Sequence, residues 1–478
     1  MKASIRPTLI LALCLCLAKN GFAAPQDATL LIHSGRVLTM DATARVLQGG
    51  VVVVSGDRIV AVGGPELLDR YSAEHTIDAR GGIVMPGMIN LHNHLPMIAF
   101  RGLGENGVRN RLYDFFFPLE KALLSRELIR ISARQAAIES AVAGVTTITD
   151  MYYYEDEVAT AVKDVGLRGV LGETVIGFPV VDAATPEAGL AYAEDFIRRF
   201  RNDPLITPAV APHAPYTVSP ELLGKVRELA ERYDVPILMH VAEMPDEKAR
   251  VMAAFKDVPP GLSIIEYLAH TGILVDRLVA AHVIHVDDED IALLRNNQVG
   301  IGHNPISNTK GSTGLAPAWE MYQRELAIGL GTDGPMSGNQ MDMLGTLRQA
   351  AIVARTRGND SVRFTPFELV HMVTVGGARA LDMEDRIGSL EAGKLADIVV
   401  IAADRPNMTP LYDPYAALVF QAYPGDVMLT VVNGDIVARD GVAIRIDRDA
   451  HAREWARITD RVKRFADEEL SPDNPKPF

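Results

Sequence analysis

Cysteine is nearly absent from this 478-residue chain, which has two, Cys14 and Cys16. Two cysteines cannot build a disulfide framework or a cysteine-rich zinc site. Basic residues are also outnumbered: 47 Lys and Arg stand against 61 Asp and Glu, for a formal net charge of −14. Nucleic acids and anionic membranes need clustered positive charge, so this balance argues against either as the main partner. A metal site, if present, must use His, Asp and Glu.

Long apolar runs are missing as well, because none reaches the roughly 20 residues that cross a bilayer. The apolar run at 8–18 follows Lys2 and Arg6, and the segment 21–23 after it ends in a small residue, Ala23. This pattern predicts a signal peptide at 1–23, with a buried N-terminal helix as the alternative. Both cysteines lie inside it, each after a leucine, which does not fit a lipoprotein cleavage site. Losing three positive charges takes the mature chain from −14 to −17. We expect a periplasmic or secreted protein without a membrane anchor.

Short β-rich runs broken by glycine occupy 24–85 and return at 386–445, where Asn433-Gly434 is a strong hairpin signal. These two pieces predict one small β-sandwich built from both chain ends, followed by a charged helical tail at 446–478. Between them, 86–385 alternates strands with helices, and Ser125, Ser219 and Thr365 are candidate helix caps. The eight strand candidates are 88–92, 146–150, 169–175, 206–211, 236–240, 278–282, 299–303 and 327–332.

Eight strands alternating with helices predict an α/β fold, a (β/α)8 TIM-like barrel, with a doubly wound open sheet as the alternative. Titratable side chains follow the ends of these strands. In a barrel such ends meet on one face, where catalysis takes place. Any one of them could instead be a hydrogen-bonded core residue or a helix cap, but their coincidence favours a site. They are His92, His94, His213, His240, His282, His303 and Asp333.

The segments around these residues resemble those of the amidohydrolase superfamily, in the branch of methylthioadenosine/S-adenosylhomocysteine deaminases and s-triazine hydrolases. The matching segments are 86–94, 213–216, 240–243, 280–282, 303–308, 331–334 and 388–397. The resemblance implies one divalent metal ion, zinc or else iron, on His92, His94, His240 and Asp333. Three imidazoles and a carboxylate would leave a position for water, whose pKa the ion lowers towards about 7. The fourth strand ends without the bridging Lys of binuclear relatives.

The same resemblance implies the catalytic roles. Glu243 would protonate a ring nitrogen while hydroxide attacks the neighbouring carbon, although it could also be a surface carboxylate that starts the next helix. His282 would hold the attacking water, and Asp333 would accept its proton. His213 and His303 are candidate substrate contacts.

Two departures bear on the substrate. Arg111 stands where S-adenosylhomocysteine deaminases place an aromatic residue, and Glu173 lies on the strand from which they use an Arg for the substrate carboxylate. A buried carboxylate would repel that group, which argues against S-adenosylhomocysteine itself. Glu173 could accept hydrogen bonds from an amino-substituted ring, or it could pair with a structural Arg.

The sequence therefore predicts a metal-dependent hydrolase that releases ammonia from an amino-substituted nitrogen heterocycle of purine or nucleoside, pterin or triazine type. Hydrolysis of another C–N bond or of a C–Cl bond at the same site is the enzymatic alternative. The non-enzymatic alternative is a binding protein, built on a barrel that has lost its catalytic activity. The expected partners are a small heterocyclic substrate and water, with no nucleic acid, and the family resemblance makes a homo-oligomer possible.

Overall fold

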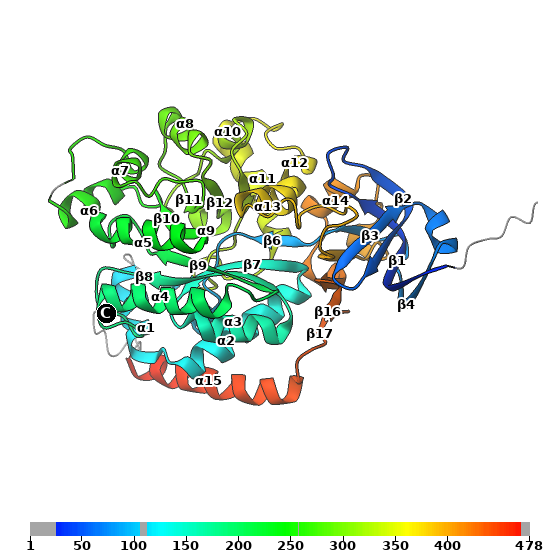
Figure 1. The fold of residues 1–478 in the computed structure, drawn as a ribbon, viewed down its shortest axis with the longest axis horizontal. Coiled ribbons are helices and arrows are strands. Elements are labelled where there is room, and N and C mark those ends of the chain that lie inside the picture. Colours follow the sequence, from blue (N-terminus) through cyan, green and yellow to red (C-terminus); the bar gives the residue numbers. More distant parts are fainter. Residues whose placement is uncertain (1–24, 106–111, 257, 470–478) are drawn as a thin grey trace, which may run out of the picture.

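The computed structural model describes residues 25–105, 112–256 and 258–469. The predicted signal peptide and Arg111 lie outside these residues. The described chain forms a barrel with a β-domain at one side (Figure 1). Within the described ranges, no helix has both the length and the apolar character needed to cross a membrane.

The barrel contains the eight predicted strands, and each is parallel to its neighbour in chain order. Leu91 N donates a hydrogen bond to Leu330 O at 2.9 Å, which joins the first strand to the last and excludes the open doubly wound sheet. The strands are β6 (Met88–Asn90), β7 (Val145–Tyr152), β8 (Arg168–Val175), β9 (Ile206–Pro212), β10 (Ile237–Val241), β11 (Leu278–His282), β12 (Gly300–His303) and β13 (Ile328–Leu330).

Helices cover the outside of the barrel, and the three predicted caps are confirmed. The side chains of Ser125, Ser219 and Thr365 each accept a hydrogen bond from a backbone N–H in the first helical turn. The helices after the strands include α1 (Phe117–Leu123), α2 (Arg126–Val142), α3 (Glu155–Val165), α4 (Pro186–Phe200), α5 (Pro220–Tyr233), α6 (Glu247–Ala254), α7 (Ile264–Thr271), α8 (Asp288–Asn296), α9 (Pro305–Lys310), α10 (Ala318–Gln323), α11 (Met343–Gly358), α12 (Pro366–His371) and α13 (Gly377–Ala380). Short turns of other helix types are η2 (Leu95–Phe100), η3 (Leu112–Phe116) and η4 (Met372–Gly376).

A second sheet combines strands from both ends of the chain, because β5 pairs antiparallel with β14. The predicted hairpin turn joins β15 to β16, with φ of 53° at Asn433 and 84° at Gly434. Gly434 is required there, since a Cβ would lie 2.0 Å from Gly56 O. The strands are β1 (Gln26–Leu38), β2 (Val46–Ser55), β3 (Arg58–Gly63), β4 (Tyr71–Asp78), β5 (Ile83–Pro86), β14 (Ile398–Ile401), β15 (Val427–Val432), β16 (Asp435–Arg439) and β17 (Val442–Ala443).

A buried ion pair connects the barrel to this sheet. Arg168, the first residue of β8, donates from Nε and Nη2 to the two carboxylate oxygens of Asp397 at 3.0 and 3.1 Å. Asp397 directly precedes β14. The predicted C-terminal helix is α15 (Arg448–Glu469), which packs along α2 (Figure 1). The ion pair between Arg168 and Asp397 therefore links the barrel to the small sheet.

Candidate metal and active site

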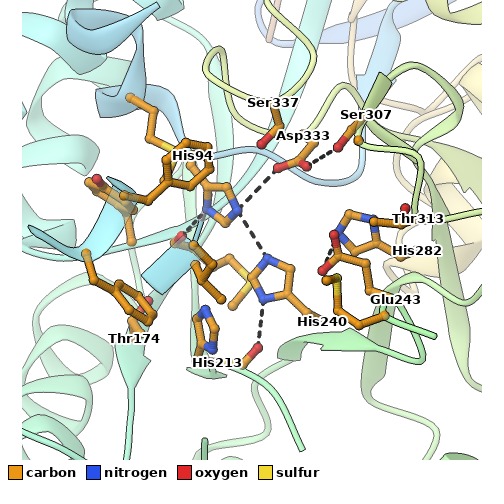
Figure 2. A pocket seen from close by; sticks show the side chains of 18 of the residues that line it. His94, Thr174, His213, His240, Glu243, His282, Ser307, Thr313, Asp333 and Ser337 are labelled. Atoms are coloured by element: carbon orange, nitrogen blue, oxygen red, sulfur yellow. Dashed lines mark hydrogen bonds and ion pairs between the residues drawn. The ribbon is translucent and has the colours of Figure 1, made fainter. Parts of the chain in front are cut away.

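The carboxyl ends of the barrel strands bring together six of the predicted site residues, His94, His213, His240, Glu243, His282 and Asp333 (Figure 2). His240 lies within β10 and His282 ends β11, while Asp333 follows β13. The backbone is in the left-handed region at Ala242, His282 and Asp333, with φ of 50°, 74° and 61°. Residues with side chains rarely adopt this conformation, and such strain concentrates at functional sites.

His94 and His240 have their ring orientation fixed by backbone carbonyls. His94 Nδ1 lies 2.6 Å from Met151 O, and His240 Nδ1 lies 2.7 Å from His213 O. A carbonyl only accepts, so both Nδ1 atoms carry the proton and both Nε2 atoms present a lone pair. These two Nε2 atoms are 3.2 Å apart and cannot hydrogen-bond to each other. Two imidazoles on one tetrahedral zinc have nitrogens about 3.3 Å apart, so the pair fits a shared cation.

His92 and Asp333 complete this group. His92 is buried, and its Nε2 has no hydrogen-bond partner among the described residues. Asp333 Oδ1 lies 3.6 Å from His92 Nε2 and 3.4 Å from His94 Nε2. A buried, unpartnered imidazole nitrogen beside a carboxylate is the arrangement that a metal ion satisfies. The described residues therefore fit a divalent metal ion on His92, His94, His240 and Asp333.

His282 faces Glu243, with its Nε2 3.9 Å from Glu243 Oε2 (Figure 2). Its Nδ1 lies 2.8 Å from the side-chain oxygen of Asn308, so Nδ1 is the protonated atom and Nε2 points to the reaction space. Burial alone would lower the pKa of His282, but the nearby Glu243 and Asp333 carboxyls raise it above its usual value. Burial raises the pKa of Glu243. A raised pKa in both groups suits them to take up and release a proton during the reaction.

Two neighbouring residues of α9, Ser307 and Asn308, form hydrogen bonds with the side chains of Asp333 and His282. Ser307 donates its hydroxyl to Asp333 Oδ2 at 2.5 Å, and Asn308 holds His282 as described. Both residues lie in the matching segment 303–308, but the resemblance implied no role for either. No local signal identifies such positioning residues, because their partners lie on other strands.

Glu247, at the start of α6, organises the loop that carries Glu243. Its carboxylate accepts hydrogen bonds from the backbone N–H groups of Ala242, Glu243 and Met244, at 3.0, 2.8 and 3.2 Å. Burial raises the pKa of Glu247 to about 7. The loop that directs Glu243 inwards is therefore fixed by the first residue of the following helix.

Of the predicted substrate contacts, His213 lines the cavity. His303 and Glu173 are buried and are not among the residues that line it. Burial lowers the pKa of both His213 and His303 to about 3, so both rings are neutral. His213 Nδ1 lies 2.9 Å from the hydroxyl of Thr217. His213 can therefore present a neutral ring to a bound molecule.

Glu173 faces away from the cavity. Its Oε2 accepts a hydrogen bond from Glu155 N at 2.9 Å, at the start of α3, while the next residue, Thr174, lines the cavity. Among the described residues, Glu173 has no Arg partner, so the predicted alternative of a pair with a structural Arg is not observed. Burial and the neighbouring Asp182 raise the pKa of Glu173 well above its usual value.

The cavity above the site has a volume of about 190 Å³. Aromatic and sulfur-containing side chains form much of its wall, which suits a flat heterocyclic ring. They include Phe116, Phe117, Tyr152, Tyr153, Tyr216, Met97, Met151 and Met244. Two charged lining residues went unassigned in the sequence analysis, Glu120 and Arg250. Tyr152 donates its hydroxyl to Glu120 at 2.6 Å, and burial raises the pKa of Glu120 to about 7.

Comparison with known proteins supports this reading of the site. The Amidohydrolase family matches residues 83–437. A 5-methylthioadenosine/S-adenosylhomocysteine deaminase of Syntrophus aciditrophicus is 34% identical over 440 residues, covering 92% of this chain and 98% of the relative. Its counterpart in Syntrophobacter fumaroxidans is 37% identical over 415 residues, covering 86% and 93%.

Two solved structures share the fold. An adenosine deaminase from Xanthomonas campestris with bound zinc superposes with a TM-score of 0.88 at 31% identity, covering 92% of this chain and 100% of that one. An atrazine chlorohydrolase from Arthrobacter aurescens, complexed with zinc, gives a TM-score of 0.83 at 26% identity, covering 90% and 100%.

Proposed function

Because this chain belongs to the Amidohydrolase family, we propose that it hydrolyses an amino-substituted nitrogen heterocycle and releases ammonia. The chain is a metal-dependent hydrolase, and hydrolytic deamination is the chemistry of the relatives that it resembles. The observation that carries the proposal is the pair of unprotonated Nε2 atoms of His94 and His240, 3.2 Å apart at the floor of an aromatic cavity.

A bound metal ion would supply Lewis acidity that makes a water molecule nucleophilic at neutral pH. Asp333 and His282 then hold the water on the side of the ring that carries the amino group. Asp333 accepts a proton from it as its oxygen bonds to the ring carbon. Glu243 donates a proton to the adjacent ring nitrogen, and the proton held by Asp333 passes to the amino group, which leaves as ammonia. The hydroxyl on the ring carbon then returns its proton to Glu243 and becomes the carbonyl. In the net reaction, one water molecule and the ring amine give a ring carbonyl and one molecule of ammonia.

The ring is of purine or nucleoside, pterin or triazine type. Support comes from the aromatic wall of the cavity and from relatives named for adenosine and methylthioadenosine deamination. Zinc is the proposed metal, because three imidazoles with one carboxylate suit zinc and both solved relatives contain it. Iron is the alternative, and metal analysis of protein purified without added metal separates the two.

Chloride is a second candidate leaving group, favoured by the similarity to an atrazine chlorohydrolase. The same attack on a ring carbon serves both reactions, since only the departing group differs. Ammonia release with a product one mass unit heavier indicates deamination. Chloride release from a chlorinated triazine indicates the second.

The test is an ammonia assay of apo and zinc-loaded protein against ring amines of the three types. Turnover that needs the metal is the expected result. Glu243→Gln should keep the metal and lose about 10²- to 10⁴-fold in kcat, as expected for a lost general acid–base group. Glu231→Gln, also on α5 and 47% exposed, is the matched control and should retain activity. Failure of every ring amine would refute deamination.

Export to the periplasm or beyond the cell is part of this proposal. Its support is the charged start, the apolar run at 8–18 and the small residues before position 24. N-terminal sequencing of protein from a fractionated bacterial host tests it. A mature N-terminus at Ala24 in the periplasmic fraction is expected, and an intact N-terminus in the cytosol would contradict it.

A further inference from the structure

Arg250, on α6, is the single Lys or Arg among the described residues that line the catalytic cavity. Its Nε donates to Asp246 Oδ1 at 2.9 Å, and its side chain is 25% exposed. Within the described ranges, no protein acceptor bonds to its two terminal nitrogens. This partly exposed guanidinium thus brings to the cavity four N–H donors without a protein acceptor among the described residues.

Two tyrosine rings hold this guanidinium in place. Its central carbon lies 5.7 Å from the ring centre of Tyr113 and 5.5 Å from that of Tyr216. Contacts with ring faces fix an arginine without consuming its N–H groups. The same two tyrosines also line an adjoining groove of about 410 Å³, so a substituent that reaches Arg250 has room to continue.

The ligand group that best matches these free N–H donors is an oxyanion. A guanidinium matches the two oxygens of a carboxylate or phosphate in a bidentate hydrogen-bonded pair. The acidic partner of Arg250, Asp246 at the N-cap of α6, bonds to Nε and is 55% exposed, which leaves the two terminal nitrogens for a ligand. Glu173 does not oppose an anion, since it faces α3 instead of the cavity.

We propose that Arg250 is a specificity-determining residue that binds a carboxylate or phosphate substituent of the heterocyclic substrate. This inference rests on the proposed deaminase function. The favoured substrates are anionic members of the ring classes above. A purely structural Arg250, which only packs the two tyrosines, would affect neutral and anionic substrates alike.

Matched substrate pairs test the proposal. Adenosine with adenosine 5′-phosphate, and pterin with pterin-6-carboxylate, differ only in the anionic group. In the zinc-loaded protein we expect kcat/KM to be higher for the anionic member by roughly 10- to 100-fold, the value of a charge-assisted hydrogen-bonded pair. Arg250→Gln should remove this preference and leave the neutral member within about threefold. Arg295→Gln, on α8 and 56% exposed, is the matched control.

A binding measurement separates this inference from the proposed function. Calorimetry with inosine and inosine 5′-phosphate, which lack the amino group, reports the subsite without turnover. A preference for the phosphate that disappears in Arg250→Gln supports the subsite even if no ring amine is hydrolysed. A wild-type protein without preference for the anion, or a variant that weakens both members equally, would overturn it. Compared with Arg250→Gln, Arg250→Lys should recover part of the preference, because lysine keeps the positive charge but cannot form the bidentate hydrogen-bonded pair.

Discussion

His94 Nε2 and His240 Nε2 lie 3.2 Å apart, although each ring has already given its only proton-bearing nitrogen to a backbone carbonyl. Two lone pairs at this distance repel each other unless a cation lies between them. Met151 O and His213 O impose this tautomer, so the backbone of two other strands prepares both ligands for a metal.

Metal removal is the first prediction that follows. We expect one divalent ion per chain, and we expect its removal by a chelator to abolish activity and lower Tm. A ligand at 100 times its Kd stabilises the folded state by about 2.7 kcal/mol. His240→Ala should lose the ion, whereas His75→Ala, exposed on β4, should keep it. Elemental analysis with thermal denaturation measures both, and full metal content in His240→Ala would contradict the assignment.

Asn308 is predicted to position His282 through its side-chain oxygen, 2.8 Å from Nδ1. Asn308→Ala removes the acceptor that fixes the tautomer. We expect kcat to fall by roughly 10- to 100-fold, as for other groups that orient active-site ligands, with the metal retained. The pH profile of kcat/KM should also shift, which a purely structural residue would not cause.

Thr309→Val on the same helix provides the control, since the described partners of the Thr309 hydroxyl are the backbone of α9 and the side chain of Gln349, none of which belongs to the site. It should leave the pH profile unchanged. An Asn308→Ala enzyme with wild-type kcat and profile would show that His282 needs no such support.

Glu120 makes stability depend on pH. Burial raises its pKa from 4.5 to about 7, so the folded protein binds this proton more tightly than the unfolded chain does. Its stabilising contribution is fully present below pH 4.5 and is lost as pH rises through 7. The loss amounts to about 3 kcal/mol in the free energy of unfolding. Glu120→Gln, which mimics the neutral acid, should remove this dependence.

Urea denaturation of both proteins between pH 4 and 8 measures the difference. The wild type should lose stability relative to Glu120→Gln as pH rises. Parallel stability curves would show that Glu120 keeps an ordinary pKa.

The ion pair between Arg168 and Asp397 connects the barrel to the small sheet, with the two side chains 1% and 3% exposed. Arg168→Met leaves a buried carboxylate unpaired, and we expect a loss of about 3–5 kcal/mol in the free energy of unfolding. Adding Asp397→Asn should recover part of this loss, because the unpaired charge is removed. Two single losses that simply add in the double variant would show that the pair is not coupled.

The sequence by itself determined the barrel and the strand-end positions of the proposed metal ligands. Strand–helix alternation is local, and residues at the ends of parallel strands must meet on one face, so His92, His240 and Asp333 could be placed together before any coordinates. The hairpin at Asn433-Gly434 was equally predictable, because its turn needs two residues that tolerate positive φ.

Only the tertiary structure decided which neighbours face the cavity. All eight residues of β8 are buried, so no alternation of polar and apolar residues shows that Thr174 points inwards and Glu173 outwards. The roles of Asn308 and Arg250 were hidden for a related reason. Their partners, His282 for one and Tyr113 and Tyr216 for the other, lie on other elements, and such contacts depend on packing that no local pattern records.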